Sequence, residues 1–316
     1  MIKRLTSSPA AFGLLALVLI TAVKAPSFYA ASNLRDLALT IAPTLVAAIG
    51  MTLVILLGEI DISIGAQYAI CAILAGLAAK AGMPIIVVAL AAMAAGSILG
   101  FINGVLVAQF RIPSIVVTLA AMMALRDLLR WTTQGAWIQN LPPSFQWAGL
   151  GQTGGSILIA ILAVTVFATF LWALRNLRAG RAVYAVGCSP ESARMAGLNP
   201  KPITIAVFAC SGMLAGLAAV LGSLRFTDIQ SGAGVGLEMK VIAAVVVGGA
   251  SIAGGRASLW GTLLGVILMT TIGTSLTYLG IEAFWEKAVQ GAIILAAVVA
   301  NALSTGSEKR LVPTVH

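Results

Sequence analysis

Long apolar runs, repeated along almost the whole chain, limit what this sequence can fold into more than any other feature. A run of ~20 apolar residues is long enough to cross the hydrocarbon core of a bilayer as a helix. Only helices and closed barrels satisfy their own backbone in lipid, and these runs lack the alternating pattern of barrel strands. The runs lie near residues 10–28, 37–57, 64–79, 84–108, 113–129, 156–174, 203–223, 239–253, 257–279 and 286–303. We therefore predict an all-α integral membrane protein, a polytopic bundle of about ten transmembrane helices.

The composition supports lipid as the solvent for most of the chain. Of 316 residues, 60% are hydrophobic and 9% are charged, whereas soluble domains carry about 25% charged residues. We therefore treat residues 1–316 as one transmembrane domain in contact with a lipid bilayer. The net charge of +9 is typical of basic loops that anchor a membrane protein. No basic patch with interleaved aromatic residues indicates a nucleic-acid partner.

Basic residues predict how the bundle is oriented. The segment 175–202 contains a single acid, Glu191, against the basic residues Arg175, Arg178, Arg181, Arg194 and Lys201. Loops rich in Lys and Arg stay on the cytoplasmic side of a membrane. Because six runs precede this loop and four follow it, we expect both termini in the cytoplasm, with Lys3, Arg4, Lys309 and Arg310. The same parity places on or near the outer side Trp131–Trp147, Gly232–Gly236, Lys24, Arg35, Arg126 and Arg225.

The polar stretch at residues 180–202, which ends in CSPESARMAGLNPKP, contains the signals of a short helix. Ser189 is a capping hydroxyl, Pro190 suits the first helical position, and Glu191 suits the positive end of the helix dipole. Gly197 is a stop signal, so we predict a helix over residues 190–196. A helix of this length is marginal alone in water and needs a surface to pack on. Its apolar residues Ala193, Met195 and Ala196, with Leu198 after them, either dock on a partner or lie on the protein's own cytoplasmic face.

The stretch GEIDISIG, residues 58–65, places two acids in an otherwise apolar region. Acids at membrane depth are costly and usually functional. Gly58 and Gly65 permit a helix break, so Gly58, Glu59, Asp61, Ser63 and Gly65 are candidates for a translocation path or a break. Proton or cation coupling and binding of a polar solute are possible roles. A span boundary at the cytoplasmic surface is the other interpretation, and at a spacing of two the acids do not share a helix face.

Sequence motifs of catalytic and nucleotide sites are missing or incomplete. The stretch GGASIAGGRAS, residues 248–258, resembles a phosphate loop, but Gly255 stands where the lysine is required. The single histidine, His316, is the last residue, and the three cysteines lack metal-site spacing. We therefore expect no catalytic residue, no metal site and no nucleotide bound by this chain, and we do not expect an enzyme.

Four stretches together resemble the permease subunits of bacterial ABC sugar importers of the ribose-type family. They are VAAIGMTLVILLGEIDISIGAQYAICA, PSIVVTLAAMMALRDLLRW, RAVYAVGCSPESARMAGLN with the glycine before it, and GLEMKVIAAVVVGGASIAGGRASLWGTLLG. That family includes ribose, galactose, xylose, rhamnose and autoinducer-2 permeases, and the similarity covers about residues 37–303. The stretch TQGAWIQNLPPSFQWAGLGQ is most similar to the rhamnose permeases. Many members of the family have an uncharged residue at the position of Glu59, so the resemblance implies no role for that acid.

The resemblance implies a permease that carries a monosaccharide, rhamnose-like or another pentose or hexose, inward across the bacterial inner membrane. The implied partners are cytoplasmic ATPase subunits that use ATP and Mg, a periplasmic sugar-binding protein, and a second permease copy. The loop 175–202 becomes the ATPase-coupling loop, with Gly180, Arg181, Ser189, Pro190, Glu191, Ala193, Arg194, Met195 and Gly197. Homodimer and heterodimer both stay open. The alternative is a secondary transporter that couples to ions through Glu59 and Asp61.

Overall fold

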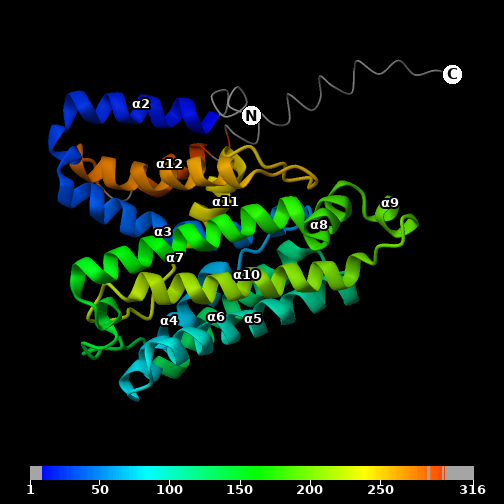
Figure 1. Ribbon diagram of the computed structural model, residues 1–316, viewed down its shortest axis with the longest axis horizontal. Coiled ribbons are helices and arrows are strands. Elements are labelled where there is room, and N and C mark those ends of the chain that lie inside the picture. The colour runs from blue at the N-terminus through cyan, green and yellow to red at the C-terminus, as the bar shows by residue number, and fades with distance from the viewer. Residues whose placement is uncertain (1–8, 283–284, 294, 296–316) are drawn as a thin grey trace.

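A computed structural model describes residues 9–282, 285–293 and 295 (Figure 1). The described residues form helices and no strand, although Ile138 and Ile229 make an isolated antiparallel bridge. The helices are α2 (Pro9–Lys24), η1 (Pro26–Tyr29), α3 (Ala31–Leu56), α4 (Ile64–Lys80), α5 (Ile85–Phe110), α6 (Ser114–Thr133), η2 (Gln146–Gly149), α7 (Gly151–Asn176), α8 (Arg178–Cys188), α9 (Pro190–Met195), α10 (Pro200–Ser223), α11 (Leu237–Val247) and α12 (Leu259–Tyr278). Residues 285–293 are also helical.

The predicted apolar runs correspond to helices wherever the structure describes them. Among the described residues, five helices are long and apolar enough to cross a membrane, namely α3, α5, α7, α10 and α12. The all-helical membrane bundle is therefore confirmed, whereas the number of ten spans stays a prediction. The last run, 286–303, is described only in part. Lys3, Arg4, Lys309 and Arg310 lie outside the described residues, so the orientation of the termini also stays a prediction.

Helix α3 is the centre of the bundle. Its residues from Ala42 to Leu56 are all buried. Helices α7, α10, α11 and α12 all contact it. A helix that is apolar around its whole circumference is expected in the interior, because no face prefers water.

Helices α5 and α10 pack closely through small residues. A Cβ atom added to Gly96 would collide with the carbonyl oxygen of Gly212, and one added to Gly100 with that of Phe208. Such backbone contact is how helices associate in lipid, where burial of apolar surface gives little advantage. The small residues of α10 therefore bring two long helices into register.

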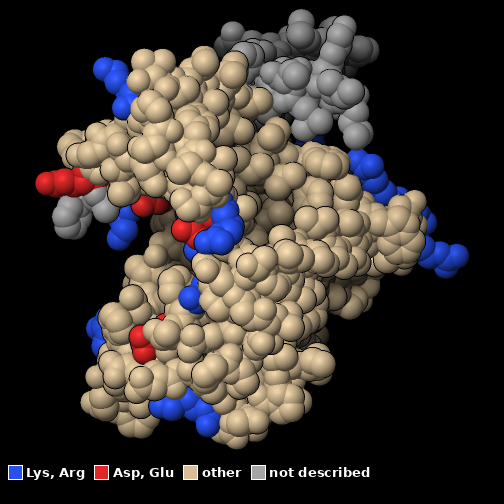
Figure 2. Space-filling model, turned by 60° about the vertical axis from the view of Figure 1, so that its left-hand side comes forward, with Lys and Arg blue, Asp and Glu red and all other residues tan. Residues whose placement is uncertain are grey.

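The outward faces of α5 and α7 are apolar. Large hydrophobic side chains such as Ile86, Phe101, Ile157 and Trp172 are at least half exposed. Figure 2 shows wide areas without charge, between a few places where Lys, Arg, Asp and Glu gather. A continuous apolar exterior requires a non-aqueous surrounding, so the chain is an integral membrane protein.

The bundle has two ends, each formed by a set of connecting segments. The α9 end carries residues 57–63, 111–113, 177–199 and 248–258 (Figure 1). The opposite end carries residues 25–30, 81–84, 134–150 and 224–231. The predicted coupling loop therefore lies at one end, and the tryptophan-rich segment lies at the other.

Candidate functional site

The short helix predicted in the coupling loop is present as α9, at the extreme end of the bundle (Figure 1). The Ser192 N–H donates to Ser189 Oγ at 3.1 Å, and Pro190 occupies the first turn. The chain turns away at Gly197, whose φ is +81°, and the Leu198 N–H donates to the Ala193 carbonyl at 2.9 Å. Each of these features follows from the local sequence, because caps and left-handed turns depend on neighbours only.

The structure divides the apolar residues of α9 differently from the prediction. Ala193 is only 4% exposed, so it packs against the protein itself. Met195 is 87% exposed, and Ala196 is exposed too. Of the two interpretations of this helix, burial of Ala193 fits packing on the protein's own face for that residue. The role of Ala193 in an ATPase-coupling loop stays a prediction. Met195 is the large apolar side chain that α9 presents outward.

Helix α8 joins α9 to the loop between α11 and α12. The Tyr184 hydroxyl donates to the Ala257 carbonyl at 3.1 Å. Cys188 Sγ lies 3.7 Å from the Gly255 carbonyl oxygen. Burial raises the pKa of the Tyr184 phenol above its ordinary value, and the charge of Arg175 partly opposes this. Helix α8 therefore connects α9 to residues 248–258 through these side-chain contacts.

Three glycine-containing segments meet at the C-terminal end of α8. We call this place the glycine junction, and it consists of residues 56–58, 187–188 and 254–255. The Gly255 N–H donates to the Leu56 carbonyl at 2.9 Å. A Cβ atom at Gly187 would collide with that same carbonyl, and one at Gly254 would lie 2.8 Å from the Gly187 carbonyl oxygen. The GGASIAGGRAS stretch thus has a packing role for two of its glycines, Gly254 and Gly255.

A buried polar network surrounds Asp61, in the segment that connects α3 to α4. Asp61 is fully buried, and its Oδ1 accepts from the Ser63 N–H at 2.9 Å and from Ser63 Oγ at 2.5 Å. Its Oδ2 accepts from Gln67 Nε2 at 3.1 Å. Asn103 Nδ2 of α5 donates to Ser63 Oγ at 2.8 Å. Hydrogen bonds from three donor groups compensate the burial of this carboxyl group.

The chain is interrupted between α3, which ends at Leu56, and α4, which begins at Ile64, so Gly65 belongs to the first turn of α4. Gly58 takes the left-handed conformation that ends α3, with φ of +81°. Ser114 and Thr118 of α6 bond the backbone of the break at Ile60 and Ile62. Glu59 is partly exposed, unlike Asp61. A translocation role for this segment stays a prediction.

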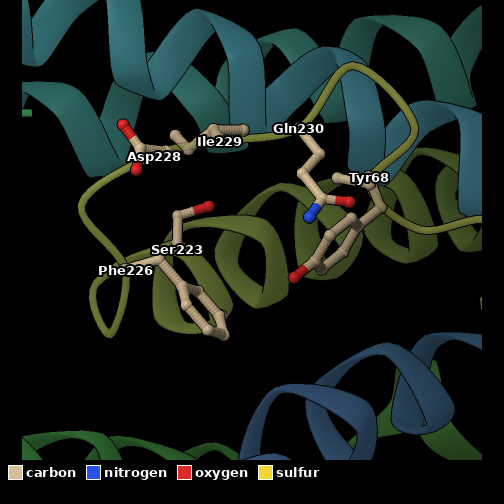
Figure 3. A pocket seen from close by; sticks show the side chains of 8 residues that line it. Tyr68, Ser223, Phe226, Asp228, Ile229 and Gln230 are labelled. Carbon is tan, nitrogen blue, oxygen red and sulfur yellow. The ribbon is translucent and has the colours of Figure 1, made fainter. Parts of the chain in front are cut away.

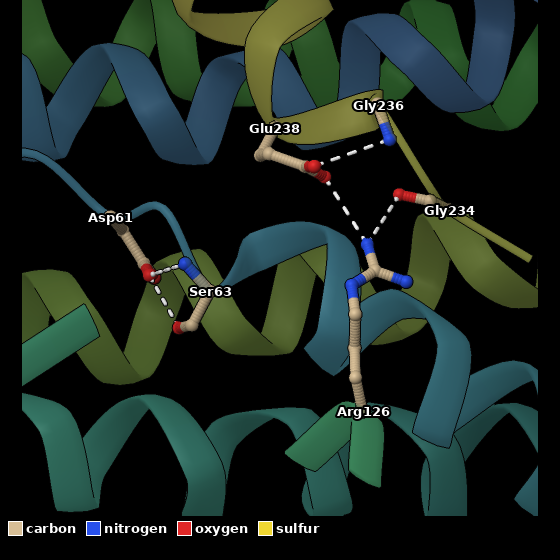
Figure 4. Close-up of polar contacts among 6 residues, drawn as sticks. All are labelled: Asp61, Ser63, Arg126, Gly234, Gly236 and Glu238. Atoms are coloured by element: carbon tan, nitrogen blue, oxygen red, sulfur yellow. Dashed lines mark hydrogen bonds and ion pairs between the residues drawn. The ribbon is translucent and has the colours of Figure 1, made fainter. Parts of the chain in front are cut away.

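An ion pair joins α6 to the start of α11 (Figure 4). Arg126 Nη2 lies 3.4 Å from Glu238 Oε2 and donates to the Gly234 carbonyl at 3.1 Å. Glu238 Oε1 accepts from the Gly236 N–H at 3.2 Å, which caps the first turn of α11. Arg126 is therefore partly buried and paired inside the bundle, and its place on or near the outer side of the membrane stays a prediction.

The segment Gly232–Gly236 lies inside the bundle rather than in a loop at its end. Near its beginning, Ile229 packs on Gly76 of α4, towards the opposite end of the bundle. Only five residues later, Gly234 lies against Gly65 in the first turn of α4. The chain therefore descends along α4 into the bundle, and α11 is a short helix of 11 residues that begins inside it. The sequence does not reveal this position, because a Gly-rich series of turns resembles a surface loop.

A polar pocket opens at the opposite end, beside this descending segment (Figure 3). Its volume is about 260 Å³, and its lining is Tyr68, Gly222, Ser223, Phe226, Asp228, Ile229, Gln230 and Ala233. A neighbouring pocket of about 230 Å³ shares Tyr68, Gly222 and Phe226 and reaches α3 and Leu237. Among the lining of the first pocket, the sequence had singled out only Ala233, within Gly232–Gly236, and in the second only Arg225 and Gly234. The reason is that α4, α10 and the descending segment come together only in the fold.

The pocket combines aromatic faces with uncharged and acidic polar groups. Tyr68 and Phe226 supply the rings, and Gln230 points towards Tyr68 in Figure 3. The Asp228 carboxylate already accepts two hydrogen bonds within the protein, from the Asn140 N–H at 3.1 Å and from the Thr227 hydroxyl at 2.8 Å. A pocket with apolar faces and a few placed hydrogen-bonding groups suits a small polar organic solute.

The fold and these features define a membrane transport subunit: a helical bundle with interrupted helices, a pocket at one end and an exposed helix at the other. Comparison with known proteins makes the class specific. The chain belongs to the family described as branched-chain amino acid transport system / permease component, which it matches over residues 33–298. Together with its relatives, this places it among ribose-type permeases of ABC import systems rather than among enzymes.

Three relatives illustrate the match. The chain is 37% identical to the probable ABC transporter permease protein YphD of Escherichia coli K12, over 92% of this chain and 87% of the relative. It is 32% identical to the ribose import permease protein RbsC of the same strain, over 91% of each chain. It is 37% identical to the autoinducer 2 import system permease protein LsrC of Yersinia pseudotuberculosis, over 80% of this chain and 72% of the relative. No solved structure matches the chain.

Proposed function

We propose that this chain is the membrane-spanning subunit of an ABC importer that moves a monosaccharide, rhamnose-like or another pentose or hexose, inward across the inner membrane. Partner ATPase subunits hydrolyse ATP with Mg, and a periplasmic binding protein delivers the sugar. A second permease copy, identical or related, completes the pathway. Family membership and the relatives named for ribose and autoinducer 2 support the solute class. This chain then supplies the path and the coupling, and holds no nucleotide itself.

The observation that carries the proposal is the connection from α9 to the interior. Helix α9 stands at the end of the bundle and presents Met195 outward. Through α8 it contacts the 248–258 loop, whose Gly255 bonds to the end of the central helix α3. A partner that moves α9 therefore moves the ends of α3 and α12 with it. Such a rigid connection suits alternating access driven from outside the membrane.

The contacts of Asp61 favour this proposal over ion coupling. Both carboxylate oxygens already accept hydrogen bonds from Ser63 or Gln67 inside the protein. A coupling carboxylate has to exchange a proton or cation with water during each cycle. The Asp61 group instead suits the permanent task of holding the start of α4.

A charge on the exposed face of α9 tests the coupling assignment. In the assembled transporter, we expect Met195→Glu to lower the ATP hydrolysis stimulated by loaded binding protein about tenfold, since loss of a well-placed interface anchor costs ~1.4 kcal/mol. Met83→Glu, at the opposite end, is the matched control and should keep full stimulation. Membrane insertion and yield should not change for either variant. Full stimulation and transport in Met195→Glu would contradict the assignment.

Co-purification tests the assembly itself. The tagged chain, extracted in mild detergent, should bring down an ATPase and, for a heterodimer, a second permease in equal amount. The purified assembly in vesicles should take up sugar only with ATP and binding protein. Uptake that needs a proton gradient and no ATPase would move the ion-coupled alternative ahead.

A further inference from the structure

An apolar groove lies at the corner between α7 and α8, at the α9 end of the bundle. Its volume is about 240 Å³. Leu53, Phe170, Ala173, Leu174, Leu177, Ala179, Gly180, Ala182, Val183, Ile203, Ala206, Val207 and Cys210 line it. Leu177 is 42% exposed, and Ala179 is exposed, so the groove opens outward rather than into the core. No charged side chain and no amide belongs to this lining.

Arginines alternate with the groove residues along the chain. Arg178 and Arg181 belong to the first turns of α8, between the lining residues Leu177, Ala179 and Ala182. Both side chains belong to exposed residues. Arg181 Nη1 donates to the Asn176 carbonyl at 3.1 Å, which holds its guanidinium at the corner where α7 ends. Positive charge therefore flanks one edge of an apolar groove.

Helix α8 itself has the character of an interfacial helix. Its 11 residues bury Gly180, Val183, Val186 and Gly187 on one face and carry the arginines outside that face. Amphipathic helices with basic polar faces typically lie at the boundary between head groups and acyl chains. The corner thus combines an apolar groove with two exposed arginines, as a site at the boundary of a bilayer requires.

We infer that this corner binds one phospholipid with an anionic head group. An acyl chain fills the groove between α3, α7, α8 and α10, and the phosphate pairs with Arg178 and Arg181. Basic pockets at the membrane surface bind anionic head groups in this way, and guanidinium forks match phosphate oxygens. The groove leads to Leu53 on α3 and to α10, so the lipid supports the angle between α7 and α8 from which α9 extends. This site is independent of the transported solute.

Lipid retention tests the inference on the full transporter. It is reconstituted in nanodiscs of phosphatidylcholine containing one part in four of phosphatidylglycerol, then released into detergent. Native mass spectrometry measures phosphatidylglycerol retained per permease chain. We expect Arg178→Gln and Arg181→Gln each to lower retention about fivefold, since each arginine contributes ~1 kcal/mol towards anionic lipid. Ala206→Phe should lower retention as well, because the ring occupies the groove without changing charge.

Matched controls separate a built site from general attraction. Arg111→Gln removes an exposed arginine from the same end of the bundle, and Ala91→Phe adds a ring to the exposed face of α5. Both should retain lipid as the unmodified chain does. Added inorganic phosphate should not displace the lipid, since the acyl chain supplies part of the affinity. Equal losses in Arg111→Gln, or unchanged retention in the arginine variants or Ala206→Phe, would overturn the site.

Discussion

Two helix breaks at the α9 end of the bundle both contain glycines with positive φ but are held by different kinds of contact. The break at residues 57–63 follows α3 and begins with Gly58 at a φ of +81°, and the break at 248–258 follows α11 and contains Gly249 at +93°. Polar side chains hold the first one, through Asp61 and its partners. Backbone hydrogen bonds hold the second, such as that from the Ser251 N–H to the Arg256 carbonyl at 2.8 Å.

The difference teaches which kind of change each break tolerates. The first break depends on hydrogen-bonding side chains, so a substitution destabilises it by removing a hydrogen-bond partner. The second break depends on glycines, which have no side chain, so a substitution destabilises it by adding a side chain where backbone segments are in contact. The two breaks meet at the glycine junction, where the Gly255 N–H bonds to the Leu56 carbonyl. Variants of each kind therefore distinguish the two mechanisms.

The largest effect is expected at Asp61. Asp61→Ala leaves the donors of Ser63 and Gln67 buried without their acceptor, which should cost about 3 kcal/mol or more of folding free energy. Asp61→Asn keeps one acceptor oxygen and should cost less. The thermal unfolding midpoint of the purified chain in detergent measures both. Asp127→Ala, at an exposed position, is the control. An Asp61→Ala midpoint equal to that of the control would show that the network does not hold the first break.

Gly187→Ala should have the next largest effect. The added methyl group collides with the Leu56 carbonyl, and backbone cannot yield as a side-chain tip does. Overpacking of this kind costs about 1–3 kcal/mol. The same change at Gly232 meets nothing within 4 Å and should stay near the original midpoint. Gly187→Ala could instead keep its unfolding midpoint and lose coupled ATP hydrolysis. That result would mean that α8 shifts without unfolding, which contradicts a rigid junction.

Gly254 and Gly249 form a matched pair within the second break. Both have positive φ, so alanine at either position costs roughly 1–2 kcal/mol of backbone strain. At Gly254 the methyl group would also lie 2.8 Å from the Gly187 carbonyl oxygen, whereas Gly249 has nothing within 4 Å. Gly254→Ala should therefore destabilise the chain more in unfolding experiments. Equal destabilisation would remove the argument that close packing holds this break.

The smallest effect is expected for Tyr184→Phe, which deletes one hydrogen bond to Ala257 and should cost about 1 kcal/mol. The folded-state pKa of Tyr184 is raised, so its contribution is complete below pH 10 and is lost as the pH rises through the folded pKa. The stability difference between the two proteins should thus shrink at strongly alkaline pH. A difference that is constant across that range would show that the phenol proton is not involved.

Local signals were sufficient for several parts of this protein. Ser189, Pro190 and Gly197 predicted α9 almost to the residue, because a cap and a stop depend on their immediate neighbours. Gly58 and Gly65 indicated the first break for the same reason. The position of Arg126 could not be predicted in this way, because its partners Gly234 and Glu238 are more than 100 residues away. Counting apolar runs assigns each connecting segment to one side of the membrane. Such a count does not describe a segment that enters the bundle and begins a helix inside it.

The lipid surroundings, the helical class, the family and the short helix of the coupling loop all follow from the sequence, since apolar length and capping residues act locally. Which residues meet follows from the packing of the helices. This packing turned Ala193 inward and Met195 outward, joined the glycines of three distant segments, and brought Tyr68 to the pocket beside Gln230. Contacts between distant segments depend on how whole helices pack, and packing in lipid is decided by shape complementarity that no single stretch contains.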